Sequence, residues 1–576
     1  MIPEKMIKRC KGWGLWCLAL LLALAGCSAK TDTEPADESQ PVVSSVEKQE
    51  TADIDSMGLG EDKTVYTADD ELSVICAYVT VQMGDEGTDT AHTFTEVNSA
   101  VRFENNAHVE NDIYARAIVQ FGDETGPLAG QFGYGETKSN ATIRVRGNSS
   151  STSPQKSYKL KLDKEAGAWR GQRNIALNKS FFDVTRFRNK LYFDMLRTVD
   201  GSASARTQFV HLYVKDETAG ETAFADFGLY TQVEVPGTRY LDNHGLDSEG
   251  YLYKAISFNF EPNEAIRETS DPAFDQAAFD TVLSCKGRED HSKLMGMVEA
   301  VNDTSQDIDD VIDTYFDREN YVTWLAYNIL MANIDTTMQN FYLYSPTNSQ
   351  KWYFIPWDGD NCLPWQEYEM EQEDVKYDAF NHGIGNWWGV ILHQRFLKQE
   401  DNRQELADKV DELHRSINKE TVDAWAQQYN QLIEPYVTSM PDLYYLGHTP
   451  EERKEIVNGL GDMVERAYTE FYESLDSLMP FWLWKPEDGY LNWSEAYAFD
   501  YADLSYRVQI SRYPDMRELA VDAATDVNYL KLEGLESGTW YWKVTAAAED
   551  GRTVNAMDKL SVGDAYYPGV AVLEVP

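Results

Sequence analysis

The sequence predicts an α+β protein with a β-rich first half, a helical region after it and a second, all-β module at the C-terminal end. The β-rich half is indicated by β-branched or alternating runs at residues 72–81, 113–121 and 141–146, separated by loops rich in Asp, Gly and Asn. In residues 271–480 apolar side chains recur at the helical spacing. The last module is indicated by residues 540–545, in which alternate side chains share one face of an expected strand.

The composition indicates a large, acidic protein. The chain has 576 residues, including 34 Tyr, 23 Phe and 15 Trp, which is enough for several domains with substantial cores. Its formal net charge is −45. A field of that sign repels phosphate backbones, so the composition excludes nucleic acid as a general partner.

Residues 1–27 have the form of a lipoprotein signal peptide. A basic start precedes an apolar run at residues 12–25, and the run ends in Leu-Ala-Gly-Cys27, which resembles the bacterial lipoprotein cleavage box. The resemblance implies a lipid on Cys27 that anchors the chain outside the bacterial cytoplasmic membrane. An ordinary secretory signal or an uncleaved anchor is the alternative. Residues 28–62, rich in Asp, Glu, Thr, Ser and Pro, are expected to form a disordered acidic linker.

Three cysteines follow Cys27 in the sequence, at Cys76, Cys285 and Cys362. Their number is odd and their spacings fit no metal site, so they predict neither a disulfide framework nor a metal centre. Cys362 is expected to be a small buried hydrophobe rather than a nucleophile.

Residues 144–162 combine a loop of small residues with a basic strand. The loop follows Arg146 as Gly-Asn148-Ser-Ser-Ser, and the strand carries Lys159 and Lys161 on one face and apolar side chains on the other. A loop with free backbone amides, followed by lysines on a strand, can hold the phosphates of a nucleotide. The alternative is a hairpin with a solvated basic face.

Two polar clusters flank a predicted hairpin of aromatic strands. The strands are expected at residues 340–344 and 352–355. Asp335 and Asn340 enter this hairpin, and Asp358 and Asp360 leave it, so both clusters are expected at its open end. Carboxylate and amide oxygens suit Mg²⁺ or Mn²⁺. The alternative is a polar hairpin whose Asp and Asn residues cap turns.

Five motifs follow one another in a fixed order along the chain. They are Arg146-Gly-Asn-Ser-Ser with Lys156-Ser-Tyr-Lys-Leu-Lys-Leu, Gly228-Leu-Tyr-Thr-Gln-Val-Glu234, Leu252-Tyr-Lys254, Asn333-Ile-Asp335 with Asn340, and Phe354-Ile-Pro-Trp-Asp358-Gly-Asp360. In this order they resemble the CotH family of atypical, protein-kinase-like proteins. The resemblance implies a two-lobed fold over residues 136–480, with a β-rich N-lobe and a helical C-lobe. Residues 63–135 would be a β-rich extension of the N-lobe.

The resemblance also implies a function and its residues. The activity would be phosphoryl transfer from ATP with Mg²⁺ or Mn²⁺. Asp335 would be the catalytic Asp, and Asn340, Asp358 and Asp360 would hold the metals. The spacing from Asp335 to Asn340 (340 − 335 = 5) equals that of the Asp and Asn in the protein-kinase catalytic loop.

The nucleotide would be bound by a second group of residues. Lys159, favoured over Lys161, would contact the α- and β-phosphates, with Glu234 as its ion-pair partner. Further contacts are expected from Arg146, Asn148 and Lys254. Gly359 stands where the family commonly has Leu, which would leave Asp358 less rigidly packed.

Residues 486–576 resemble a fibronectin type III domain, which implies an immunoglobulin-like sandwich. Trp493 matches the core Trp of its second strand, and Gly538-Thr-Trp-Tyr-Trp-Lys-Val matches its penultimate strand. Such a module would be a spacer or a platform that binds a protein or a polysaccharide.

Two classes of function follow from the sequence. The first is a membrane-anchored, extracytoplasmic kinase that acts on Ser, Thr or Tyr of surface or secreted proteins. The second is a catalytically weak or inactive scaffold that binds protein or carbohydrate at the cell surface, which the scarcity of ATP outside cells favours.

Overall fold

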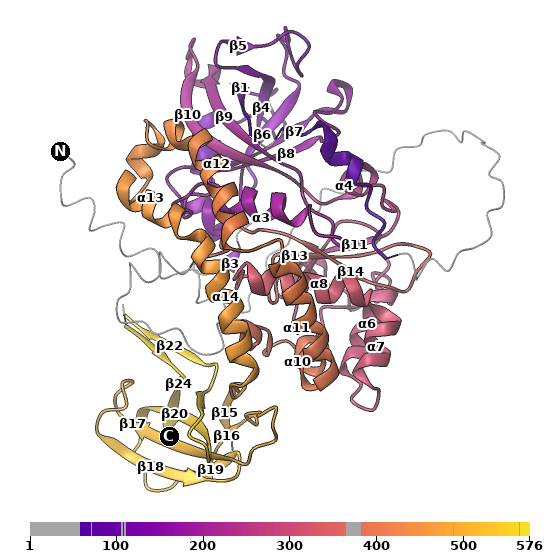
Figure 1. Ribbon diagram of the computed structural model, residues 1–576. Helices are drawn as coiled ribbons and strands as arrows, with labels where there is room; N and C mark the ends of the chain where they lie inside the picture. The colour runs from indigo at the N-terminus through magenta and orange to yellow at the C-terminus, as the bar shows by residue number, and fades with distance from the viewer. Residues whose placement is uncertain are drawn as a thin grey trace, which may run out of the picture. The chain divides into compact units, whose positions relative to one another are not determined.

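The computed structural model describes residues 58–70, 72–104, 107–108, 111–364, 382–487, 489–563 and 565–575 (Figure 1). The predicted signal peptide and most of the acidic linker lie outside these residues. The contacts divide the chain into two units: unit 1 takes the chain through Leu325, Met338–Leu363 and Ile417–Gly461, and unit 2 takes Ala326–Thr337, Pro364–Ser416 and the chain from Asp462 onward. In the described part of the chain, no helix combines the length and the apolar character needed to cross a membrane.

Unit 1 is built on a β-barrel. Its strands follow the order β1-β9-β10-β8-β7-β6-β4-β5, and β4 also pairs with β1, which closes the sheet and leaves β5 beyond β4 (Figure 1). The strands are β1 (Val74–Gln82), β4 (Ala115–Asp123), β5 (Gly126–Pro127), β6 (Ala141–Arg146), β7 (Ser157–Leu162), β8 (Asn174–Asn178), β9 (Thr207–Asp216) and β10 (Ala225–Glu234). The predicted runs at residues 72–81, 113–121 and 141–146 are β1, β4 and β6, so the β-rich first half is confirmed.

Alternate side chains of the strands fill the barrel. Tyr158, Leu160 and Leu162 of β7 are buried in this core, whereas Lys159 and Lys161 between them are half-buried. The two-residue period of the strand therefore places both lysines on the outer face of the barrel, and they share one face as predicted.

Two helices pack on the outside of the barrel. Helix α3 (Arg188–Leu196) contacts β9 and β10, and helix α12 (Lys419–Val437) contacts β10. Tyr429 of α12 meets Phe209 of β9 edge to face, with ring centroids 5.5 Å apart. These contacts bind a late segment of the chain to the barrel.

Helix α3 begins at Arg188, and residues 180–187 before it are not helical. Ser180 and Arg186 have φ angles of 45° and 66°, which an α-helix does not allow. The carboxylate of Asp183, which precedes the helix, accepts the Arg188 N–H at 2.9 Å and so caps the first turn.

A second sheet of unit 1 carries the polar hairpin. Its order is β12-β11-β13-β14, and all of its pairs are antiparallel. The strands are β11 (Tyr251–Ala255), β12 (Leu283–Cys285), β13 (Phe341–Ser345) and β14 (Tyr353–Pro356). The aromatic side chains of this sheet form a core with those of helix α8 (Arg318–Leu330), in which the rings of Trp324 and Phe354 stack with centroids 4.4 Å apart. The predicted hairpin is confirmed by the register Phe341↔Pro356 to Tyr344↔Tyr353.

Shorter elements complete unit 1. The helices beside the second sheet are α5 (Gln276–Val282), α6 (Ser292–Asn302), α7 (Ile308–Tyr315) and α8 (Arg318–Leu330), whose last turn belongs to unit 2. The remaining elements are η3 (Lys63–Ala68), α2 (Phe94–Ser99), β2 (Phe103–Glu104), β3 (Ala107–His108), η4 (Ser149–Thr152), η5 (Lys164–Ala166), η6 (Glu217–Ala219), α4 (Thr238–Asn243), η9 (Asp442–Tyr445) and α13 (Pro450–Asn458).

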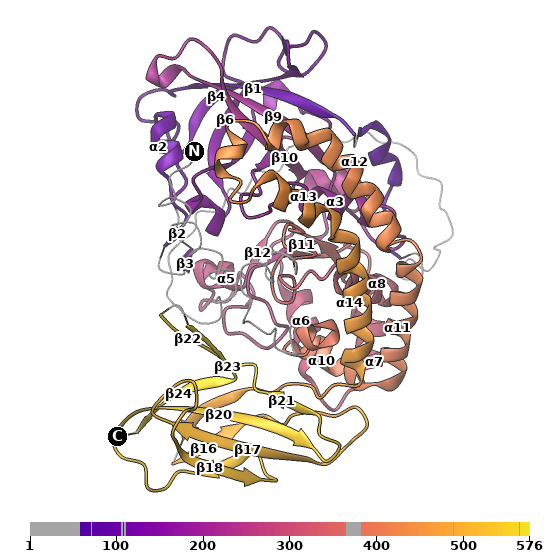
Figure 2. The same ribbon diagram turned by 60° about the vertical axis from the view of Figure 1, so that its left-hand side comes forward.

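Unit 2 joins helices to two β-sheets. The helices are η8 (Gly383–Trp387), α10 (Ile391–Lys398), α11 (Glu400–His414) and α14 (Leu460–Leu475). One sheet has the order β15-β16-β19, and the other has the order β18-β17-β20-β21 with β24 also on β20 (Figure 2). The strands are β15 (Leu483–Glu487), β16 (Tyr490–Trp493), β17 (Leu504–Ser511), β18 (Leu519–Thr525), β19 (Tyr529–Lys531), β20 (Gly538–Ala548), β21 (Thr553–Asn555), β22 (Lys559–Val562), β23 (Ala565–Pro568) and β24 (Val570–Val575).

The two sheets of unit 2 share one core. Trp493 of β16 and Trp542 of β20 are buried in it, together with Val508 of β17. The alternation predicted for residues 540–545 is visible in β20, where Trp540, Trp542 and Val544 are buried. The hairpin of β22 and β23 is inserted between β21 and β24, the two strands that pair with successive parts of β20.

Candidate functional site

The open end of the β13–β14 hairpin places two predicted metal ligands next to each other. Beyond the pair Phe341↔Pro356, the N–H of Trp357 donates to the carbonyl of Asn340 at 3.1 Å. Asp358 follows directly and is half-buried, whereas Asp360 is exposed. The hairpin register therefore holds Asn340 and Asp358 just beyond the ends of two adjacent strands, as the sequence predicted.

Asn340 and Asp358 share an uncommon backbone conformation. Their φ angles are 59° and 60°, in the left-handed region, which Asn and Asp enter more readily than other residues with a side chain. Each such residue costs on the order of 1–3 kcal/mol, and residues of this kind cluster at functional sites. Both residues lie where the paired strands end, just beyond Phe341 and Pro356.

Gly359 is fixed by helix α3. A Cβ atom on Gly359 would lie 2.2 Å from Cγ of Tyr192, and the Gly359 N–H donates to Oδ1 of Asn189 at 3.2 Å. The ring of Tyr192 thus fills the space that a side chain at residue 359 would need. Gly359 itself is therefore closely packed, and the expectation that Asp358 is less rigidly held stays a prediction.

Two cations face Asp358 from different sheets. Arg146 ends β6 of the barrel, and Lys254 lies in β11, where it pairs with Tyr342 of β13. Burial lowers the pKa of Lys254 to about 8, and the charge of Asp358 opposes this shift. Burial also lowers the pKa of Arg146, again opposed first by Asp358. Arg146, Lys254 and Asp358 are all half-buried, and the exposed Asp360 also acts on Arg146. A phosphate would neutralise the positive charge that Arg146 and Lys254 bring to this place.

The loop after Arg146 is partly closed on itself. Gly147 has a φ of 85°, and a Cβ there would lie 1.9 Å from Oγ of Ser150. The Ser151 N–H donates to the Asn148 carbonyl, and Lys156 Nζ donates to the Ser151 carbonyl at 2.6 Å. The loop therefore forms the 3₁₀ turn η4 rather than a fully open cradle of amides, because its Ser and Asn residues bond to their neighbours. Asn148 is exposed at the start of this turn.

The predicted ion pair between Lys159 and Glu234 is wrong. Lys159 pairs with Ala176, which pairs with Val233, so these three residues share the outer face of the barrel. Glu234, the next residue, projects to the opposite face. There it accepts from His244 Nε2 at 3.0 Å and from Asn243 Nδ2 at 3.0 Å.

Lys161 shares the outer face with Lys159, because it pairs with Asn174 two residues before Ala176. Arg144, opposite Lys159 in β6, bonds to Asp112 at 2.9 Å. This basic face therefore lies along β6 and β7, and Arg146 stands at its end.

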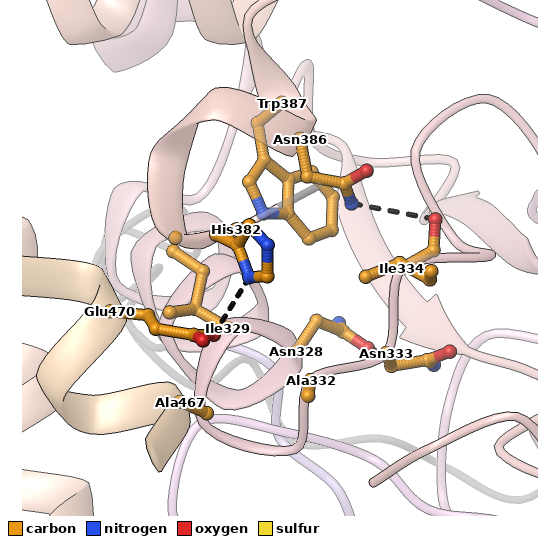
Figure 3. Close-up of a pocket in the computed structure, with 11 residues that line it drawn as sticks. Asn328, Ile329, Ala332, Asn333, Ile334, His382, Asn386, Trp387, Ala467 and Glu470 are labelled. Atoms are coloured by element: carbon orange, nitrogen blue, oxygen red, sulfur yellow. Dashed lines mark hydrogen bonds and ion pairs between the residues drawn. The ribbon is translucent and has the colours of Figure 1, made fainter. Parts of the chain in front are cut away.

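Asp335 lies in unit 2, in a segment held by asparagines. Asn333 Nδ2 donates to Asn328 Oδ1 at 3.1 Å, and Asn386 Nδ2 donates to the Ile334 carbonyl at 3.4 Å (Figure 3). These residues line a cavity of about 20 Å³, which is room for a water molecule. Asn333 Oδ1 is buried there without a protein partner in the described part of the chain. Asp335 directly follows this segment and is half-buried.

His382 closes the other side of this cavity. Its Nδ1 lies 2.8 Å from Oε2 of Glu470 in α14 (Figure 3). Burial opposes ionisation of Glu470, but the bond to His382 and the neighbouring charges outweigh it and lower the Glu470 pKa. The sequence did not single out this pair, because His382 and Glu470 are 88 residues apart.

A buried ion pair was also missed from the sequence. Lys179 Nζ lies 2.7 Å from Oδ1 of Asp442, and both side chains are 1% exposed. Asp442 also accepts from Gln155 Nε2 and from the Leu229 N–H. Burial lowers the pKa of Lys179 to about 8, against the charge of Asp442. The pair ties η9 to the barrel, and no local pattern joins residues so far apart in the sequence.

Comparisons with known proteins agree with these motifs. The family model described as CotH kinase protein matches residues 143–481. The inner spore coat protein H of Bacillus subtilis (strain 168) is 26% identical over 222 residues, which are 38% of this chain and 57% of that protein. The chain therefore spans a little over half the length of this relative.

A solved structure, the proinflammatory kinase CtkA of Helicobacter pylori, is 12% identical to the chain. The match covers 55% of this chain and 94% of CtkA, with a TM-score of 0.26. The family model matches more than half of the 576 residues, and its range includes every motif from Arg146 to Asp360. The chain belongs to the CotH kinase protein family.

Proposed function

We propose that the protein transfers a phosphoryl group from ATP to a Ser, Thr or Tyr hydroxyl of a protein, with a divalent metal. One observation carries this proposal. Arg146 and Lys254 are half-buried on two different sheets and interact electrostatically with Asp358, which adjoins Asn340 at the end of a hairpin. In a polyphosphate with a bound metal, the phosphate oxygens would pair with Arg146 and Lys254, and the metal would bind Asp358 and Asn340.

The donor set fits Mg²⁺ or Mn²⁺. Asp358 and Asn340 provide a carboxylate and an amide oxygen, and Asp360 adds an exposed carboxylate nearby that also acts on Arg146. Hard oxygen ligands of this kind, few in number, suit a metal that is shared with substrate phosphates. When bound, the metal would neutralise charge on the phosphate oxygens.

The protein's own residues would bind and orient the reactants. Lys254 and Arg146 would hold the phosphates, and we assign this role to Lys254 ahead of Lys159 because Lys254 faces Asp358. Lys161 and Asn148 would contribute at the edge of the site. Asp335 would accept the hydrogen bond of the acceptor hydroxyl, which positions its oxygen for attack.

The test is phosphoryl transfer by the full chain with ATP and either metal, measured on itself and on a mixture of surface proteins. Asp358→Asn and Asp335→Asn should each reduce transfer by at least a hundredfold. Asp335→Asn should keep the rise in Tm that ATP and metal give the wild type, because Asp335 does not hold the nucleotide. A matched control is Asp313→Asn, an exposed carboxylate that pairs with Arg318.

Two results would contradict the proposal. Transfer that persists in both variants would show that the activity comes from elsewhere. Binding of neither ATP nor another nucleotide by the wild type, with either metal, would favour the inactive scaffold.

We further propose that Cys27 carries a lipid and that the protein acts outside the bacterial cytoplasmic membrane. The cleavage box and the acidic linker support this. Labelling cells with a fatty-acid analogue should mark the wild type and not Cys27→Ser. Label retained in Cys27→Ser would overturn the assignment.

We also propose that residues 486–576 form a fibronectin type III domain. The two sheets with a shared core, and Trp493 buried in it, support this assignment. We assign the domain the role of a spacer or of a platform for a protein or polysaccharide. Deletion of the domain should alter retention on cell-wall material or partner proteins if it is a platform, and should leave retention unchanged if it is a spacer.

A further inference from the structure

Three metal-ligating side chains meet on the outer face of the barrel. Cys76 of β1 pairs directly with His211 of β9, and Glu124 lies in the turn between β4 and β5. The ligand atoms of Cys76, His211 and Glu124 all lie within 4.8 Å of one another. Cys76 and His211 are buried, whereas the Glu124 side chain is 51% exposed, so the cluster is open to solvent on one side.

His211 lies between two carboxylates. Its Nδ1 is 3.0 Å from Oε1 of Glu124, and its Nε2 is 2.8 Å from Oδ1 of Asp226. A neutral imidazole has only one N–H, so one of its nitrogens would direct a lone pair at an anionic oxygen. A positive charge is needed between the ring and that oxygen, and either a second proton or a metal ion can supply it.

The surroundings favour a metal on Nδ1. Asp226 also accepts the Gly228 N–H at 2.7 Å, so it is fixed and can receive a proton from Nε2. A carboxylate in that position commonly fixes the ring of a metal-bound histidine. On the Nδ1 side the Cys76 thiol stands beside the Glu124 carboxylate and is hydrogen-bonded to it, and cysteine is a preferred ligand of Zn²⁺.

We propose that Cys76, His211 and Glu124 bind Zn²⁺, with Asp226 as the residue that positions the His211 ring. Tetrahedral zinc with bonds of about 2.0–2.3 Å requires ligand atoms about 3.3–3.8 Å apart. The 3.0 Å between His211 and Glu124 must widen slightly, and side-chain rotation of the exposed Glu124 allows this. Because the Glu124 side of the cluster is exposed, water would supply the fourth ligand.

The site comes from strands that are distant in sequence, which explains why the cysteine spacings did not predict it. The bulge of β10 between Asp226 and Leu229 helps to form the site, because it turns Asp226 towards His211. Tyr213 donates to Glu124 at 2.6 Å, and Tyr436 of α12 donates to the same carboxylate at 3.3 Å. Zinc would therefore join β1, β9 and the β4–β5 turn, at a place separate from Asp358.

The experiment is titration of the full chain, stripped with a chelator, with Zn²⁺ and with Co²⁺ as a spectroscopic probe. We expect one ion per chain, a thiolate-to-cobalt charge-transfer band, and a rise in Tm. Cys76→Ser and His211→Gln should abolish all three. Asp226→Asn should weaken zinc binding roughly ten- to hundredfold, as outer partners of metal ligands do.

Controls separate loss of the site from loss of the fold. Cys285→Ser removes a half-buried thiol elsewhere in unit 1 and should bind zinc as the wild type does. Glu124→Gln changes a half-exposed side chain and keeps an oxygen that Tyr213 can donate to, so it should keep the circular dichroism of the wild type and weaken zinc binding. The proposal is overturned if the wild type binds no zinc, or if Glu124→Gln and Cys76→Ser bind it with unchanged affinity. The first result would mean that a proton on His211 supplies the charge.

Discussion

The contact between Gly359 and Tyr192 makes a prediction about the residue beside Asp358. In Gly359→Ala, the new Cβ would lie 2.2 Å from Cγ, 2.4 Å from Cδ1 and 2.6 Å from Cβ of Tyr192. All three separations are below van der Waals contact, and Tyr192 is fully buried, so its ring cannot swing into solvent. Overpacking of this kind costs about 1–3 kcal/mol.

The assay compares Gly359→Ala with Gly296→Ala. Gly296 lies in α6, where an added Cβ has no atom within 4 Å, so that change should stabilise the protein by about 0.5–1 kcal/mol through helix propensity. We expect the Tm of Gly359→Ala to fall and that of Gly296→Ala to hold or rise. We also expect Gly359→Ala to weaken binding of ATP with Mg²⁺, because displacement of residue 359 moves Asp358.

The result that would refute this reasoning is a Gly359→Ala protein with wild-type Tm and nucleotide affinity. The segment around Asp358 would then have room to adjust, and the close approach of α3 would have no part in holding it.

Two further predictions concern buried charges. Asp442→Asn should destabilise the protein by about 3–5 kcal/mol, because it leaves the buried Lys179 ammonium without its counter-ion. Asp271→Asn, which breaks a half-exposed pair with Arg267, should cost under about 1 kcal/mol. Equal Tm values for the two variants would contradict this prediction. Burial lowers the pKa of His244, but bonds to Glu234 and Glu61 outweigh it and raise the pKa above 6.5, so its stabilisation is complete below that pH and is lost as pH rises through the raised pKa. His244→Gln should therefore flatten the fall in unfolding free energy on the alkaline side, and an unchanged slope would contradict the role of His244.

Much of the site could be predicted because its pattern is local. Asn340 and Asp358 flank two short aromatic strands, and a hairpin has only one open end, so their proximity follows from the strand prediction alone. The same holds for the shared face of Lys159 and Lys161, which is fixed by the two-residue period of β7.

Errors arose where the result depends on register between distant strands. Glu234 and Val233 differ by one position, and that position decides which face of the barrel each side chain takes. Motif order could place Glu234 near β7 but could not give its face. The role of Tyr192 against Gly359 was missed for a similar reason, since α3 reaches residue 359 only through the tertiary fold.

The barrel closure was not predicted from the sequence, whereas α11, α12 and α13 lie within residues 271–480, which were predicted to be helical. The pairing of β1 with β9 is parallel and joins residues more than 130 positions apart, so no turn signal marks it. Helices α11 and α13 are rich in charged side chains, which leaves their apolar stripe short. Their stability comes from tertiary packing, as with Arg453 of α13, which donates to the Thr185 carbonyl at 2.9 Å.

The most direct test of the central claim is calorimetric titration of the full chain with ATP and Mg²⁺, with Lys254→Met and Lys351→Met side by side. Lys351 lies beside β14 on the same hairpin, but its Nζ donates to the Asp313 carbonyl. A lost charge-assisted contact costs about 1.5–3 kcal/mol, so Lys254→Met should weaken binding roughly ten- to hundredfold while Lys351→Met leaves it unchanged. Equal affinity in the two variants would contradict the claim that Arg146, Lys254 and Asp358 form the phosphate site.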